Sequence, residues 1–204
     1  MLRVAFAIGV LATFPAGTGA FGATENVLYC AAGGRVTYRP VLHAHSPFIT
    51  THPTRHGIAI SGAIDTCEGT GAFPGEKPLG GGTFSASGKL RMLAGNFQPS
   101  CEDQSPLGIA PLDLKAKLIG FDGRGLGGVT KGTLHSGSII VSGDEVEANM
   151  SGAFSSGPYA HQPLHLYMEF NLDAGTFAAA CASKDGIAGL DFGGNAASYL
   201  RIGD

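Results

Sequence analysis

The chain has 204 residues, with 13 Lys and Arg, 16 Asp and Glu and a formal net charge of −3. Its basic residues are scattered along the sequence, which argues against nucleic acid or another polyanion as the partner. The length suffices for one ordinary domain and is short for two. Glycine is abundant, with 33 residues, and tryptophan is absent. Because the glycines fall largely between alternating segments, they indicate turns and bulges.

The chain begins with the layout of a secretory signal peptide. Residues 1–3 give a short basic start, residues 4–14 are apolar, and small residues follow. Pro15 interrupts the apolar run well short of the ~20 residues that a spanning helix needs. Candidate cleavage points follow Ala20, Gly22 and Ala23. We favour cleavage after Gly22, so that residues 1–22 are removed and residues 23–204 form a single exported domain.

Two observations argue against a membrane attachment of the processed chain. Cys30 follows the bulky Tyr29, whereas the acylated cysteine of bacterial lipoproteins follows a small residue. No second apolar run of spanning length appears later in the sequence. We therefore expect a secreted, extracellular protein with no membrane partner after signal cleavage.

Four cysteines remain after processing, and they favour two disulfides because the count is even and the chain is exported. They are Cys30, Cys67, Cys101 and Cys181. Four cysteines allow three connectivities, and spacing does not choose among them. A metal–thiolate site is disfavoured because no two of these cysteines lie within a few residues of each other.

Much of the sequence alternates between apolar and polar residues, the pattern of strands with one buried face. The clearest alternating segments are residues 112–118, 145–154 and 165–172, and residues 58–64 show the same pattern more weakly. Residues 174–182 come nearest to a helix, but Gly175 and Cys181 fit a turn and a strand as well. We predict an all-β domain of roughly eight to ten antiparallel strands, folded as a β-sandwich or a β-barrel.

Several short motifs resemble a large group of exported, Gly- and Thr-rich β-proteins from actinobacteria. They are Cys30 followed by residues 35–40 (RVTYRP), the Gly-rich segment between Cys67 and Cys101, and residues 156–160 (SGPYA) before Cys181. The resemblance implies an antiparallel sandwich or barrel in which Cys67 pairs with Cys101 and Cys30 with Cys181. It implies no activity. The chain departs from the group by lacking a mid-chain tryptophan.

A histidine-rich segment is the most unusual local feature. Four histidines fall between residues 43 and 56, namely His43, His45, His52 and His56. His43 and His45 would point the same way on a strand, and imidazoles are common ligands of zinc and copper. His161 and His165 form a second pair. Against a metal site, the prolines at 47 and 53 indicate a loop of solvated side chains, and no carboxylate lies nearby to orient the rings.

Two further features have weaker functional interpretations. Residues 123–128 (GRGLGG) match the dinucleotide motif G-x-G-x-x-G, but a strand pattern follows them where that motif needs a helix, so we expect a hairpin loop. The polar faces of residues 145–149 and 165–171 could line a cavity, and we expect them to be an outer, solvated face. Recognisable nucleophile motifs are absent.

These observations leave the activity open between different classes of protein. We favour a secreted, non-enzymatic binding protein that recognises a surface component, a small ligand or another protein, with a protease inhibitor as one subclass. The lack of tryptophan argues mildly against a carbohydrate-binding face. The alternative is a secreted metal-dependent enzyme or metal-binding protein that uses the segment from His43 to His56. The third hypothesis is a structural component of the cell envelope.

Overall fold

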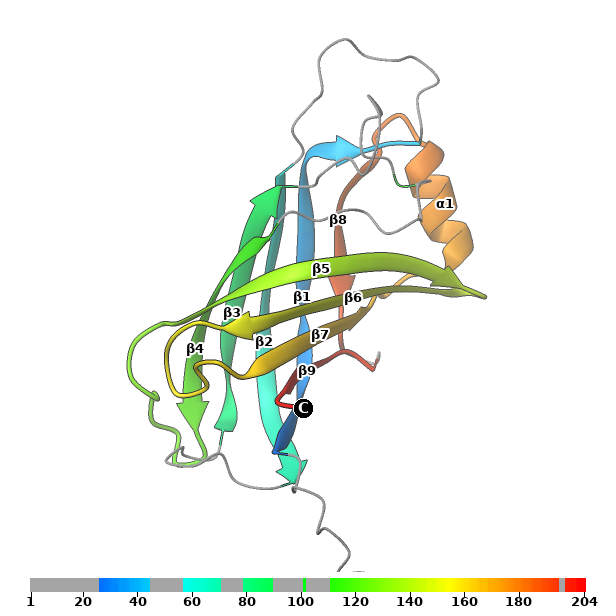
Figure 1. Ribbon diagram of the computed structural model, residues 1–204. Coiled ribbons are helices and arrows are strands. Elements are labelled where there is room, and N and C mark those ends of the chain that lie inside the picture. Colours follow the sequence, from blue (N-terminus) through cyan, green and yellow to red (C-terminus); the bar gives the residue numbers. More distant parts are fainter. Residues whose placement is uncertain (1–25, 45–56, 71–78, 90–100, 102–110, 195–196) are drawn as a thin grey trace, which may run out of the picture.

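The computed structural model describes residues 26–44, 57–70, 79–89, 101, 111–194 and 197–204. These residues form nine strands and one helix (Figure 1). The elements are β1 (Val27–Leu42), β2 (Gly57–Thr70), β3 (Leu79–Lys89), β4 (Leu112–Gly120), β5 (Thr130–Ser142), β6 (Glu145–Phe154), β7 (Pro163–Glu169), α1 (Ala174–Ala182), β8 (Ile187–Phe192) and β9 (Tyr199–Ile202).

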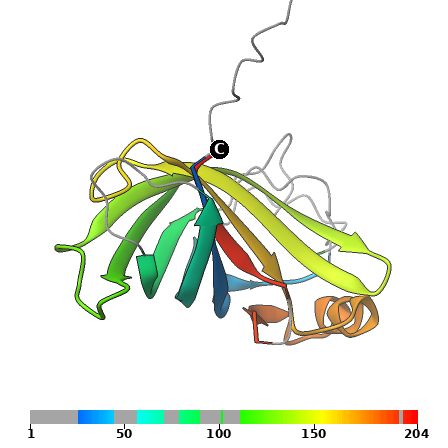
Figure 2. The same ribbon diagram turned by 90° about the horizontal axis from the view of Figure 1, so that it is seen from below.

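Eight of these strands close into an antiparallel barrel, so that of the two architectures expected the protein has the barrel. The strand order is β2-β3-β4-β5-β6-β7-β9-β1, and β1 pairs with β2 to complete the ring. The strands are seen curving round in Figure 2. β8 is additional: it pairs with β1 from Gly34 to Leu42, beyond the short stretch that β9 occupies. Closure pairs every edge of the eight strands with a neighbour.

The barrel interior is built by the alternation seen in the sequence. In β4, Leu112, Leu114, Ala116 and Leu118 are buried, and the residues between them are exposed. β6 and β7 follow the same rule, with Val146, Ala148 and Met150 buried on β6 and Leu164, Leu166 and Met168 on β7. The predicted strands are thus confirmed, and β6 has the predicted bounds.

Residues 174–182, which fitted a turn and strand as well as a helix, form α1. Asp173 is its N-cap, because one carboxylate oxygen accepts from the Thr176 backbone N–H at 2.8 Å and the other from the Thr176 hydroxyl at 2.7 Å. Capping by Asp explains why residues that resemble a turn begin a helix here. Phe177 and Cys181 join the core, and Ala174 N–H donates to the Asp144 carbonyl in the β5–β6 turn at 3.0 Å.

The structure contains the two expected disulfides, but the pairing implied by the family resemblance is wrong. Cys30 pairs with Cys67, and Cys101 pairs with Cys181. The register of β1 and β2 places Cys30 directly opposite Cys67, with their Cα atoms 4.0 Å apart. Those two sulfurs are therefore neighbours within one strand pair, and Cys67 does not bond with Cys101.

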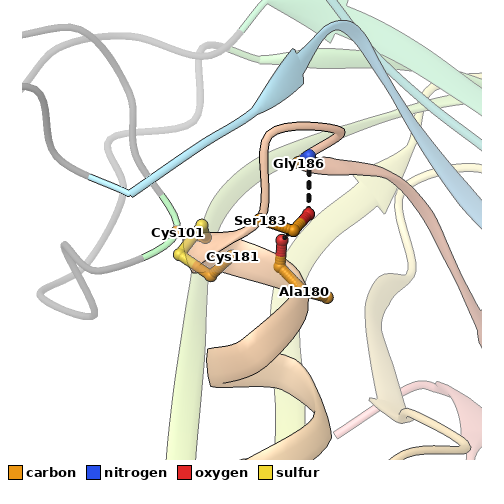
Figure 3. Close-up of a disulfide and its surroundings, with 5 residues drawn as sticks. All are labelled: Cys101, Ala180, Cys181, Ser183 and Gly186. Carbon is orange, nitrogen blue, oxygen red and sulfur yellow. Dashed lines mark hydrogen bonds between the residues drawn. A yellow bond between two sulfur atoms is a disulfide. The ribbon is translucent and has the colours of Figure 1, made fainter.

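The second disulfide lies where the end of α1 meets residue 101 (Figure 3). Backbone hydrogen bonds hold both cysteines to the end of β1: Cys101 N–H donates to the His43 carbonyl at 3.2 Å, and Ala44 N–H donates to the Cys181 carbonyl at 2.9 Å. The Ser183 hydroxyl donates to the Ala180 carbonyl and accepts from Gly186 N–H, which completes the helix end. The bridge therefore fixes α1 against this end of the barrel.

Candidate functional site

The barrel interior is apolar in the part of the chain that the structure describes. Thr130 and Ser198 are the buried residues there with small polar side chains. Ser198 is satisfied by the backbone, since its hydroxyl accepts from Glu169 N–H at 2.8 Å and donates to the Glu169 carbonyl at 3.3 Å. Tyr38 is also buried, and this burial raises the pKa of its phenol far above the ordinary value. The phenol therefore stays neutral.

The polar faces of β6 and β7 point outward, as predicted. Glu145 and Asn149 are exposed, and Glu147, His165 and Glu169 are half-buried on the outer wall. The neighbouring inward positions carry apolar side chains. A site on these strands is therefore a surface site on the barrel wall.

Three tyrosines and an arginine gather on this outer wall, where β7, β9 and β1 are hydrogen-bonded neighbours (Figure 1). We call Tyr29, Tyr167, Tyr199 and Arg201 the tyrosine cluster. Strand pairing brings them together, because Tyr167 is the Cα partner of Tyr199, and Arg201 is the Cα partner of Tyr29. Directly opposed side chains on one face of an antiparallel pair touch each other.

The rings of the cluster are packed against one another. Tyr167 and Tyr199 stack with centroids 5.2 Å apart and an interplanar angle of 22°. Tyr199 meets Tyr29 edge to face at 5.8 Å, and the Arg201 guanidinium carbon lies 5.9 Å from the centroid of the Tyr29 ring. Such aromatic and cation–π pairs each add roughly 0.5–1.5 kcal/mol beyond buried area. The cluster is thus held in one arrangement although Tyr29 is 49% exposed.

Carboxylates border the cluster and keep one of its phenols protonated. Partial burial, the hydrogen bond to Glu147 and the negative charges of Glu147, Glu169 and Glu145 together raise the pKa of Tyr167 to about 12. A phenol with this pKa remains a neutral hydrogen-bond donor at any physiological pH. Glu169 is itself held, since one of its carboxylate oxygens accepts from Ala197 N–H at 3.3 Å.

Arg201 brings an unused donor to the same surface. Its Nε is buried and has no hydrogen-bond partner among the described residues. A buried donor without a partner costs about 1–3 kcal/mol. On the strand beside it, His165 is the Cα partner of Arg201, and its Nδ1 lies 3.0 Å from the Ser151 hydroxyl oxygen. The wall therefore combines aromatic rings with a cationic side chain.

The tyrosine cluster is only partly predictable from the sequence. Tyr167 belongs to the polar face of the alternating segment 165–172, but no motif marks Tyr29, Tyr199 or Arg201 as members of a site. A local signal exists, because Tyr199 and Arg201 alternate with the buried Leu200 and Ile202. The pairing of β9 with both β1 and β7 is long-range, and no local pattern specifies it.

The proposed histidine site falls mostly outside the described residues. His45, His52 and His56 are not among them, so the metal hypothesis stays untested. His43 lies directly after β1, close to the backbone of Gly186. His161 is exposed, with a φ of 70°, and lies in the turn before β7. Among the described residues no group of three or more His, Cys, Asp or Glu side chains could hold a metal ion.

The GRGLGG segment is a hairpin loop, as predicted. It connects β4 to β5, which pair antiparallel, and no helix follows it. Gly120 N–H donates to the Arg124 carbonyl at 2.8 Å, and Leu126 N–H donates to the Leu118 carbonyl at 2.9 Å. The arrangement that a dinucleotide needs, a helix N-terminus after the glycines, is therefore not present in this segment.

Comparison of the chain with protein-family models, with curated proteins and with solved structures gives no significant match. The resemblance to exported actinobacterial proteins therefore stays a prediction. In the part of the chain that the structure describes, none of the helical structure has the length and apolar character needed to cross a membrane.

Proposed function

We propose that this protein is an exported, non-enzymatic binding protein that recognises another protein through the tyrosine cluster. The observation that carries the proposal is the packing of three tyrosine rings and one arginine on a single outer face of β7, β9 and β1. The two disulfides support export, because such bonds persist in oxidising compartments.

The composition of the cluster is typical of the centre of a protein interface. Tyrosine and arginine are the residue types over-represented among interface positions that dominate binding energy. Tyrosine offers a large contact area at a low cost in conformational entropy, since it has two side-chain torsions. Here Tyr167 and Tyr199 are already stacked on neighbouring strands. Binding would therefore cost little side-chain entropy at these two rings, because they are already held in place.

The surroundings of the cluster supply the polar rim that such an interface needs. Glu147 and Glu169 lie on one side, and Ser151 and His165 lie on the other along the same strands. The Arg201 guanidinium, which lies against the half-exposed Tyr29 ring, would offer its positive charge to the partner. A partner with an apolar centre and at least one carboxylate or carbonyl oxygen facing Arg201 fits this surface.

Affinity capture from the exported and envelope proteins of the source cell tests the proposal. The immobilised wild type is compared with Tyr29→Ala and Tyr199→Ala. Phe121→Ala, in the loop after β4, is the control because it removes an exposed aromatic ring outside the tyrosine cluster. We expect at least one protein to be retained by the wild type and by Phe121→Ala and lost with both tyrosine variants. In titrations of that protein, each tyrosine variant should weaken binding about thirtyfold, the effect of a residue worth roughly 2 kcal/mol.

The controls decide how a negative result is read. Far-ultraviolet circular dichroism and a cooperative urea transition must show that Tyr29→Ala and Tyr199→Ala are folded. If folded variants retain the same proteins with the same affinities as the wild type, the tyrosine cluster is not the binding surface and the proposal is wrong.

A further inference from the structure

The loop between β4 and β5 displays most of the exposed large apolar side chains of the described residues. Phe121 is 64% exposed, Val129 43% and Ile119 41%, and the fourth such residue is Tyr29 of the tyrosine cluster. Exposing apolar side chains to water is unfavourable, and a contiguous group of them marks a contact surface. All three of these side chains lie within residues 119–129, which we call the hairpin tip.

Basic side chains flank this tip. Lys115 and Lys131 are directly opposed Cα partners on β4 and β5, Lys117 lies closer to the tip, and Arg124 lies within it. Alternation places Lys115, Lys117 and Ile119 on one outward face, and it likewise places Val129 with Lys131. The β3 residues paired with Lys115 and Lys117 are the neutral Ser85 and Thr83.

The charge of this hairpin is opposite to that of the rest of the molecule. Residues 115–131 contain four basic residues and one acidic residue, a net charge of +3, whereas the remaining nine basic and 15 acidic residues give the rest of the chain −6. The one carboxylate, Asp122, is engaged, because it accepts from Arg124 N–H at 3.0 Å. Opposed lysines repel each other on a sheet, and an anionic surface would relieve that repulsion.

The tip is an ordered turn that presents these side chains. Gly120 N–H donates to the Arg124 carbonyl at 2.8 Å, and Gly123 N–H donates to the Gly120 carbonyl at 2.9 Å. The backbone N–H of Ser155, in the loop between β6 and β7, donates to the Lys131 carbonyl at 2.9 Å. Leu126 alone turns inward and packs against the core. The exposure of Phe121 therefore belongs to a fixed structure.

We propose that the β4–β5 hairpin docks this protein on an anionic lipid surface, with Phe121, Ile119 and Val129 entering the headgroup region and the lysines contacting the lipid phosphates. The apolar tip fits the apolar region beneath the lipid headgroups, and the basic flanks fit the negative charge of such a surface. The negative remainder of the chain is repelled by it, which orients the molecule with the hairpin foremost. This docking departs from the expectation of no membrane partner, which rested on the bulky Tyr29 before Cys30 and on the absence of a second spanning run.

The docking surface is separate from the tyrosine cluster. In the closed order of strands, β4 lies on the opposite side of the ring from β9. A protein docked through the hairpin would thus present the tyrosine cluster away from the lipid. The two proposals can fail independently, because they involve no residue in common.

Sedimentation with lipid vesicles tests the docking. The full processed chain is mixed with vesicles of phosphatidylcholine alone and with vesicles that also contain phosphatidylglycerol. We expect binding to the anionic vesicles and little to the neutral ones. Lys115→Gln and Lys117→Gln should each weaken the partition about fivefold, the effect of one basic residue at such a surface. Phe121→Ser should weaken it about tenfold, and Lys184→Gln and Tyr29→Ala, outside the hairpin, should leave it unchanged.

Three outcomes would overturn the docking. Equal binding to neutral and anionic vesicles would show that the lysines have no role. Failure of folded wild type to bind either vesicle at low salt would remove the proposal outright. Binding to soluble dextran sulfate as tightly as to vesicles, unaffected by Phe121→Ser, would identify a general polyanion site in which the apolar tip takes no part.

Discussion

At the scale of single residues, the tyrosine cluster follows from the same two-residue alternation that fills the barrel. Leu166 and Leu200 point inward, so Tyr167 and Tyr199 beside them must point outward, and strand pairing makes them stack. The outward direction of Tyr167 was predictable from the alternation in 165–172. Its contact with Tyr199 was not, because it depends on a pairing between segments about 30 residues apart in sequence, across α1 and β8.

The environment of Tyr167 makes a prediction about its titration. The Tyr167 phenol should ionise near pH 12, measured as the difference in absorbance between the wild type and Tyr167→Phe. Glu147→Gln removes both the accepting carboxylate and its charge, so it should lower the pKa towards the ordinary 10.0. Glu145→Gln, which removes only the weakest of the contributing charges, should have a smaller effect. Equal titration of all three proteins would contradict the assigned cause.

The same pKa shift has a consequence for stability in alkali. The folded pKa is raised above its unfolded value, so the contribution of Tyr167 is fully present below about pH 10 and is lost as the pH rises through about 12. The melting temperature of Glu147→Gln should therefore fall less than that of the wild type over this interval. A parallel fall in both proteins would show that Tyr167 has no part in the alkaline transition.

At the scale of elements, strands were more predictable than the helix and the disulfide pairing. β6 has the predicted bounds, and its buried residues Val146, Ala148, Met150 and Phe154 all fall on one face of the strand. α1 was ambiguous because Asp173 and Gly175 are equally typical of turns, and the hydrogen bond that the Thr176 backbone N–H donates to the Asp173 carboxylate marks the helix cap. The pairing of Cys30 with Cys67 depends on the register of β1 with β2, which four cysteine positions do not specify.

Non-reducing peptide mapping should therefore yield one fragment that joins Cys30 to Cys67 and another that joins Cys101 to Cys181. The sequence separations are 37 and 80, for which loop closure predicts a loss of about 4 kcal/mol for each bridge on double replacement by serine, measured by urea unfolding. Free thiols, or a fragment that joins Cys67 to Cys101, would contradict the structure.

The turn after β8 offers a matched pair of glycine substitutions. Gly193 and Gly194 both have positive φ, 84° and 78°. A Cβ at Gly193 would lie 2.5 Å from the Ala32 carbonyl oxygen, whereas one at Gly194 would meet nothing within 4 Å. Gly194→Ala should cost about 1 kcal/mol from backbone strain alone. Gly193→Ala should cost about 3 kcal/mol, since a clash with β1 is added. Equal losses in urea unfolding would refute this packing.

At the scale of the whole molecule, sequence periodicity predicted an all-β domain but left the choice between sandwich and barrel open. Alternation shows that each strand has a buried face, and both architectures satisfy it. The barrel depends on β1 pairing with β2 on one edge and with β9 on the other. The clustering of basic residues was likewise not predictable from the sequence, because Lys115 and Lys131 become neighbours only when β4 pairs with β5.

The proposed export also concerns the whole chain, and it predicts a defined N-terminus. N-terminal sequencing of protein recovered from outside the cell should begin at Ala23, because cleavage after Gly22 places small residues at both recognition positions. Protein that is found only inside the cell and still carries residues 1–22 would contradict export, and with it the proposed extracellular partner.

The tyrosine rings themselves give the most direct test of recognition through the barrel wall. The chain has five tyrosines and no tryptophan. Tyr29, Tyr167 and Tyr199 form the cluster, whereas Tyr38 and Tyr159 are buried, at 3% and 1% exposure. Ring-selective NMR spectra are recorded while the captured partner is added. The chemical shifts of the three cluster tyrosines should change together, and those of the two buried tyrosines should remain unchanged. A partner that binds without moving the cluster resonances would contradict the account.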